Sequence, residues 1–204
     1  MNSKLRFIVF IALSVSSFPC FGANDTTRPA GSVSAEEIKD SDELARMYEE
    51  DQSDRKPIAG KQIDWIIVGP RDKAREARVK EFYATNQLRT GNDYHRAAMV
   101  LQHAGKPEDF LLAHEFCVIA IFKGIDARWL AAASEDRFLQ SIERPQRFGT
   151  QSKKMGDSPW SLGEIDASVT DAHRAEMKVP SLDQAKARLD KQNELLEHAK
   201  KPKQ

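Results

Sequence analysis

The sequence has few cysteines, no excess of charge of either sign, and no long apolar run after its first residues. Its two cysteines are Cys20 and Cys117, so a chain that loses its N-terminus by cleavage can form no internal disulfide. Its 31 basic and 31 acidic residues balance, which gives no electrostatic footprint for nucleic acid. We therefore expect no nucleic-acid partner and no transmembrane anchor in the mature chain.

The sequence also lacks the usual signatures of metal, phosphate and dinucleotide sites. No His-x-x-x-His or Glu-x-x-His pair sets two metal ligands on one helix face. No Gly-rich phosphate loop, dinucleotide fingerprint or nucleophile elbow is present. We therefore expect no metal and no cofactor. Cys117 lies within an apolar run, and we expect it to fill the core rather than to act as a nucleophile.

The apolar run at the N-terminus has the order of a secretory signal peptide. Lys4 and Arg6 precede the apolar residues 7–13, and small and turn-forming residues follow. We expect a cleaved signal peptide over residues 1–23 and hence a periplasmic or secreted protein with two more acidic than basic residues. The alternative is a lipoprotein anchored through Cys20.

The rest of the chain divides into three parts. Residues 24–39 are rich in Thr, Pro, Gly and Ser, which predicts a flexible tether. Residues 40–199 carry repeated helix caps and apolar faces, which predict a single helical domain. Residues 200–204 form a basic tail. Residues 65–68 are apolar but too few to assign, and they fit a buried loop, one helical turn or a strand.

Cap and stop residues mark the successive helices. Asn86 fits the left-handed position that ends a helix. Alanine-rich helix faces, whose side chains are single methyl groups, allow neighbouring helices to approach closely. The helices are expected to begin near Ser34 or Asp40, after Pro70, and at Thr90, Pro107, Asp126, Thr170 and Ser181.

The short links between the helices of residues 90–141 predict the fold. Helices joined by about three residues must lie antiparallel to their neighbours in sequence. Residues 111–122 are apolar on nearly every side, so we expect this helix to be central. The prediction is an all-α fold of antiparallel helical hairpins, stacked into one compact or short solenoid-like domain of the tetratricopeptide type, although no internal repeat is convincing.

Antiparallel packing brings polar residues of neighbouring helices together. Counting outward from the turn at Gly124 places His114 near Asp136 or Arg137. Arg137 can pair with a carboxylate, either an internal one such as Asp136 or Asp93 or one on a ligand. Around the previous turn, Gln102 and His103 are expected near Glu108 and Asp109, and a further network is expected from Asp51, Gln52, Arg55 and Arg75.

After the helix that carries Arg137, three uncharged hydrogen-bonding residues lie around a turn. Gln146, Thr150 and Gln151 surround Gly149. A turn needs only Pro and Gly, so the polar side chains have another use. They point either inward, to bind backbone groups and lock the fold, or outward, toward a ligand.

Three functional hypotheses follow. In the first, the chain is an exported binding module for an unknown protein, peptide or small ligand, with a polar patch where the Gly149 loop meets the central helices. In the second, it is a hydrolase-type enzyme whose general base, His103 or His114, is oriented by Asp136. In the third, the polar residues are a structural lock. The candidate site residues are Gln102, His103, His114, Asp136, Arg137, Gln146, Thr150 and Gln151.

The sequence resembles a bacterial family of uncharacterised, mostly exported helical proteins with a domain of unknown function. The resemblance covers residues 44–185 and implies an all-helical fold and export, but no activity. Two positions depart from the family: Ala104 stands where relatives often have Gly, and Ile142-Glu143-Arg144 replaces a Gly-containing turn. The matching segments are Asp51-Gln52-x-x-Arg55, Arg71-Asp72-x-x-Arg75, Thr90-Gly91-x-Asp93 through Gln102-His103, Ala113-His114, Trp129-Leu130 through Asp136-Arg137, Pro145-Gln146 through Gly149-Thr150-Gln151, and Thr170-Asp171-x-x-Arg174.

Overall fold

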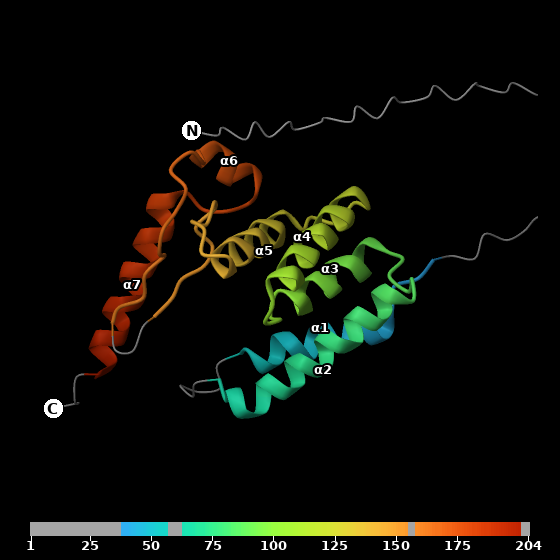
Figure 1. Cartoon of the computed structure of the whole chain (residues 1–204). Coiled ribbons are helices and arrows are strands. Elements are labelled where there is room, and N and C mark those ends of the chain that lie inside the picture. Colours follow the sequence, from blue (N-terminus) through green and yellow to red (C-terminus); the bar gives the residue numbers. More distant parts are fainter. Residues whose placement is uncertain (1–37, 57–62, 155–157, 201–204) are drawn as a thin grey trace, which may run out of the picture. The chain divides into compact units, whose positions relative to one another are not determined.

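In the computed structural model of the chain, helices are the main secondary structure of the described residues, which are 38–56, 63–154 and 158–200 (Figure 1). No strand forms in these ranges, so the expected all-α class is confirmed. The expected signal peptide, the tether up to residue 37, the cap at Ser34 and residues 201–204 of the tail lie outside the described residues. The helices are α1 (Asp42–Asp54), α2 (Trp65–Ala84), α3 (Gly91–Leu101), α4 (Pro107–Phe122), α5 (Arg128–Ser141), α6 (Asp171–Glu176) and α7 (Leu182–Lys200).

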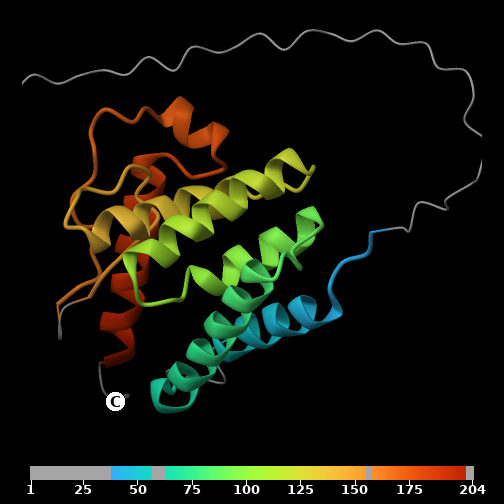
Figure 2. The same cartoon turned by 45° about the vertical axis from the view of Figure 1, so that its right-hand side comes forward.

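Helix α4 packs against both α3 and α5 (Figures 1 and 2), and α3 also contacts α1 and α2. Small side chains line these contacts and let the helix backbones approach closely, as the sequence predicts. Cys117 of α4 is fully buried, and burial raises the pKa of its thiol to about 12, so it is a core residue rather than a nucleophile. The buried alanines are Ala97, Ala98, Ala113, Ala120, Ala131, Ala132 and Ala133.

Helices α1 and α2 pack against α3 and extend the same core. Leu44 and Met47 of α1 and Val79 and Phe82 of α2 are buried there. The final helix, α7, is less buried: most of its described side chains are exposed. Its Asn193 side chain forms two hydrogen bonds with the backbone of Trp160, in the segment before α6. No helix within the described ranges is long and apolar enough to cross a bilayer.

The start of α2 differs from the prediction. The helix begins at Trp65, capped by Asp64, and continues through Pro70. Residues 65–68 are therefore its first turn rather than a strand or a buried loop. Trp65 and Ile66 remain 62% and 87% exposed. Pro70 lies in the second turn of α2, where it removes the hydrogen bond to the carbonyl of Ile66.

Helix α4 is less enclosed than its composition predicts. Leu111, Val118 and Phe122 lie on its exposed side, and Phe122 is 88% exposed. The opposite side, with Phe116, is buried. The apolar pattern alone therefore misjudged the burial of this helix, because two packed neighbours cover only part of a helix surface.

The helix caps agree with the sequence in three places and differ in two. Thr90 forms the expected reciprocal capping box with Asp93, and Thr170 caps α6. Asn86 has the expected positive φ of 56° after α2. The N-cap of α1 is Ser41 rather than Asp40, since the Asp40 carboxylate instead accepts hydrogen bonds from α3.

At α5 the helix begins one residue after the predicted cap. Ala127 occupies the N-cap position without a side-chain bond. Asp126 binds the guanidinium of Arg128 instead. The shift is small, and it leaves the predicted helix in place.

Candidate functional site

The structure divides the candidate residues between two places. Asp136 and the three polar residues of the loop belong to one cluster, which we call the loop lock: Asp136, Gln146, Thr150 and Gln151. The other candidates lie where the ends of α1 and α3 meet α5, or between α4 and α5: Gln102, His103, Arg137 and His114.

The loop lock is built around the fully buried Asp136 carboxylate. One carboxylate oxygen accepts the backbone N–H groups of Arg147 at 2.7 Å and Phe148 at 2.9 Å. The other accepts the backbone N–H of Thr150 at 2.9 Å and its hydroxyl at 2.7 Å. Because an ionised carboxylate only accepts hydrogen bonds, it satisfies four donors of a loop that has no regular structure. Asp136 therefore holds the loop against α5.

The two glutamines complete the loop lock. Gln146 is fully buried, and its amide donates to the carbonyls of Gln151 and Leu162 and accepts from the Gln151 N–H at 3.0 Å. The Gln151 side chain donates to the carbonyl of Ala133 at 3.3 Å and to Thr150 Oγ1 at 2.9 Å. Their hydrogen bonds go to the protein itself, so these side chains point inward.

Two further residues fix the path of the loop. Gly149 has a φ of 72°, and a Cβ at this position would lie 3.2 Å from the side chain of Ile165. The buried Arg174 of α6 donates to the carbonyl of Phe148. On its outer side the loop borders a pocket of about 200 Å³, whose lining includes Thr150 but neither glutamine.

The expected pairing of a histidine with Asp136 is not found. His114 Nδ1 lies 3.0 Å from the carbonyl oxygen of Ala131 and, as an N–H, donates to it. His103 pairs with a different carboxylate, described below. All of the hydrogen bonds to Asp136 come from the loop, so Asp136 cannot orient a general base in this arrangement.

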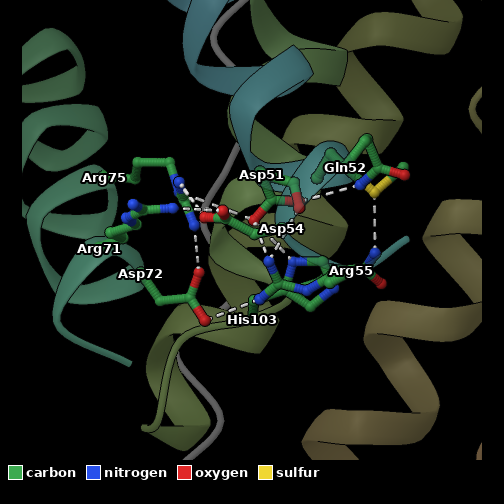
Figure 3. A network of polar contacts seen from close by, with 10 residues as sticks. Asp51, Gln52, Asp54, Arg55, Arg71, Asp72, Arg75 and His103 are labelled. Carbon is green, nitrogen blue, oxygen red and sulfur yellow. Dashed lines mark hydrogen bonds and ion pairs between the residues drawn. The ribbon is translucent and has the colours of Figure 1, made fainter. Parts of the chain in front are cut away.

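A second cluster joins the end of α1 to α2 (Figure 3). It contains three carboxylates and three guanidinium groups, and we call it the ion-pair network. Arg55 contacts both Asp51 at 2.9 Å and Asp72 at 2.7 Å. Arg75 contacts Asp72 at 2.6 Å and Asp54 at 2.9 Å. The full set is Asp51, Asp54, Asp72, Arg55, Arg71 and Arg75.

The expected network of Asp51, Gln52, Arg55 and Arg75 is thus present. Arg75 points inward, whereas its neighbour Ala74 is exposed. Burial alone lowers the pKa of Arg75, but its hydrogen bonds to Asp72 and Asp54 outweigh burial and raise it. Arg75 is therefore a paired buried cation.

His103 is attached to this network. Its Nδ1 lies 3.0 Å from the fully buried Asp51. Burial lowers the pKa of His103, although Asp51 acts in the opposite direction, and the charges of Arg55 and Arg137 lower it further. A neutral His103 that donates from Nδ1 to Asp51 leaves Nε2 as an acceptor.

Arg137 has no partner. Among all described residues, none forms a hydrogen bond or an ion pair with its guanidinium, and its Nε is buried without a partner. Neither of the expected carboxylates reaches it, because Asp136 binds the loop and Asp93 caps α3. Burial lowers the pKa of Arg137, and the nearby charge of Arg55 adds to this effect.

Two other buried polar groups lack a strong hydrogen-bond partner among the described residues. Gln102, at the end of α3, is 6% exposed and donates only to the sulfur of Met99, which is a weak acceptor. Ser134 is fully buried, and its hydroxyl has no partner among the described residues. Ser134 lies three positions before Arg137 and thus on the same side of α5.

Sequence reasoning missed three members of the ion-pair network, Asp54, Arg71 and Asp72, and it also missed the buried Ser134. The signal for Asp72 was available, because Asp72 and Arg75 are three residues apart on one helix and such pairs meet. Asp54 and Ser134 carry no comparable signal, since their roles depend on which helix faces them.

The described residues contain no group of three or more His, Cys, Asp or Glu side chains that could hold a metal ion. The fold and the two clusters define an all-helical domain with a loop locked to one helix and an unpaired cation beside a balanced ion-pair network. No family model, curated protein or solved structure matches the chain. The resemblance to the exported bacterial family therefore stays a prediction.

Proposed function

We propose that the chain is an exported helical binding module whose site is centred on Arg137, beside Arg55 and His103, and receives an anionic group of a peptide or small ligand. The observation that carries this proposal is the half-buried Arg137 guanidinium, which has no counter-ion and no hydrogen-bond acceptor among the described residues. We call Arg137, Arg55 and His103 the Arg137 site.

The free energy of an unpaired buried cation supports this choice. Leaving a buried donor unsatisfied costs about 1–3 kcal/mol, and more for a charged group. Arg75 and Arg174 also have a buried Nε without a hydrogen-bond partner, but both contact carboxylates, so their charges are compensated. An anionic ligand would give Arg137 the counter-ion that carboxylates of the protein give to Arg75 and Arg174.

The loop lock supports the proposal indirectly. Asp136 and Arg137 are consecutive residues of α5, so their side chains leave the helix about 100° apart. The bonds from Asp136 to the loop hold one side of α5, and Arg137 projects from another side toward Arg55 and His103. A site held on a rigid helix is positioned better than one on a mobile loop.

The test is to replace Arg137 by an apolar residue of similar length, Arg137→Met. If Arg137 is a binding residue, the variant protein without ligand should be more stable than the wild type, because an unpaired cation is removed. It should also lose the increase in melting temperature that added anions give to the wild type. A Met variant that is destabilised would show that Arg137 has a structural partner and would contradict the proposal.

Two matched controls are available in the same chain. Arg75→Met removes a paired buried cation and leaves three carboxylates with two guanidinium groups, Arg55 and Arg71, so it should be strongly destabilising. Arg144→Met changes an exposed arginine and should alter neither stability nor anion binding. The export part of the proposal is tested separately by N-terminal sequencing of the mature protein, which should begin after residue 22 or 23.

One observation favours a second function, a hydrolase-type enzyme. The His103 and Asp51 pair has the geometry of a histidine oriented by a carboxylate, at 3.0 Å, and Nε2 of a neutral His103 can accept a proton. In this version Asp51 replaces Asp136 as the orienting group. Hydrolysis of a set of chromogenic esters that disappears in His103→Gln, while the variant stays folded, would support the enzyme over the binding module.

A further inference from the structure

We infer that the Arg137 site takes a singly charged carboxylate rather than a doubly charged phosphate. This inference rests on the proposed function and deepens it by naming the ligand's chemical class. It is drawn from the balance of charges around Arg137 and from which of its nitrogens remain accessible.

The charges of the ion-pair network beside Arg137 cancel. The ion-pair network contains three carboxylates and three guanidinium groups, and every one of them contacts a partner of opposite charge within 3 Å. Arg55 therefore offers no uncompensated charge to a ligand, although it is near Arg137. The network as a whole is neutral.

His103 does not add a positive charge at neutral pH. It is mostly buried, and its side chain is 13% exposed. The groups that face it are Asp51 and Arg55 of α1 and Arg137 of α5. Two of these three are cations, and burial also opposes protonation, so the imidazole is neutral. Arg137 is then the one uncompensated charge at this junction among the described residues.

A single positive charge in a partly buried site matches a single negative charge. A second negative charge would be left uncompensated, and an uncompensated charge away from water is costly. The balance therefore favours a carboxylate over a phosphate monoester, which carries a charge of about −1.5 to −2 at pH 7.

The accessible part of Arg137 fits the same ligand. Of its three guanidinium nitrogens, Nε alone is buried without a partner, so the two Nη nitrogens keep contact with solvent. The end of a guanidinium group presents two parallel N–H bonds, which match the two oxygens of a carboxylate. A lysine at this position would supply the positive charge without the two parallel N–H bonds.

The experiment uses the mature chain labelled with 15N-arginine, and it follows the side-chain Nε–H resonance of Arg137 by NMR. This resonance is assigned by its loss in Arg137→Met. The probes are acetate, acetamide and methyl phosphate at pH 7.5, which share a methyl group and differ in charge. Acetate should shift the resonance in a saturable way, and its Kd should be at least about tenfold lower than that of acetamide and no higher than that of methyl phosphate, in line with the larger contribution of charge-assisted hydrogen bonds.

Each other outcome has a distinct meaning. If methyl phosphate binds about tenfold tighter than acetate, the carboxylate inference is wrong and the anion-binding function stands. If acetamide binds as well as acetate, charge is not what the site recognises, and the inference is also wrong. If none of the probes moves the resonance, the proposed function falls with the inference.

A lysine variant separates the contribution of the two parallel N–H bonds of Arg137 from that of its positive charge. Arg137→Lys keeps the positive charge and removes the paired N–H groups. Acetate binding, followed by the change in melting temperature, should weaken by about tenfold in this variant. Equal binding by the two proteins would overturn the bidentate geometry. Arg144→Lys serves as the control and should leave acetate binding unchanged.

Discussion

Asp136 and Arg137 are adjacent on α5 and have opposite situations. Asp136 accepts four hydrogen bonds from the loop at 2.7–2.9 Å, whereas Arg137 has no partner among the described residues. Two neighbouring charges that do not pair with each other indicate two separate tasks. The carboxylate holds the fold, and we propose that the cation holds a ligand.

Asp136→Asn should destabilise the protein strongly. The isosteric amide retains one oxygen acceptor and places a donor against loop N–H groups, so at least one or two buried donors lose their acceptor. Each such loss costs about 1–3 kcal/mol, and we expect a decrease of at least 2 kcal/mol, roughly, in the free energy of unfolding measured with urea. Asp126→Asn, which changes an exposed ion pair, is the control and should cost little. A decrease no larger than that of the control would show that the loop does not depend on Asp136.

Gln151→Ala should destabilise the protein moderately. The side chain donates to Ala133 and Thr150, while its backbone bond to Gln146 is retained. The loss should be about 0.5–1.5 kcal/mol, or roughly 2–4 °C of melting temperature for each kcal/mol in a chain of this size. Ser152→Ala alters the exposed neighbour as a control. An unchanged melting temperature in Gln151→Ala would reject its role in the loop lock.

Glu143→Gly should stabilise the protein. Glu143 follows α5 with a φ of 58°, a conformation that glycine adopts without strain. We expect a gain of about 0.5–1 kcal/mol, less than the full strain, because glycine also increases the entropy of the unfolded chain. Asn86→Gly at a φ of 56° should change stability less, since Asn tolerates this conformation better. If both substitutions have the same effect, strain at Glu143 is not what limits stability.

The pH dependence of stability should report His103. Its pKa in the folded protein lies below the ordinary value of 6.5 because of burial, so the unfolded chain takes up a proton at a higher pH than the folded chain does. The free energy of unfolding therefore falls as the pH decreases below 6.5. His103→Gln should flatten the decrease between pH 6.5 and 5. His95, whose pKa burial also lowers, contributes a similar slope, and it should persist in the His103 variant.

Much of the helical framework could be predicted from local patterns. The Thr90 and Asp93 capping box, the left-handed Asn86 and the buried alanine faces all depend on residues close in sequence, and the structure has each of them. Residues 65–68 were ambiguous because four residues cannot distinguish a turn of helix from a strand.

The site was harder to predict because it depends on how helices are offset along their axes. Counting from the Gly124 turn placed His114 beside Asp136, but the structure places it beside Ala131, closer to the turn. Residue counting assumes that the two helices run level with each other. The sequence identified Arg137 as a residue that needs a partner, but it could not show that both nearby carboxylates are already engaged.

The convergence of the loop on one carboxylate has a consequence for exchange with solvent deuterium. The amides of Arg147, Phe148 and Thr150 all donate to Asp136. If one of these hydrogen bonds breaks while the other two remain, the buried carboxylate loses part of its hydrogen bonding. Their hydrogen exchange should therefore share one opening free energy, well above that of the exposed Ser152 amide. A loop of only a few residues would then open as a single cooperative unit, with Asp136 setting the rate for all three.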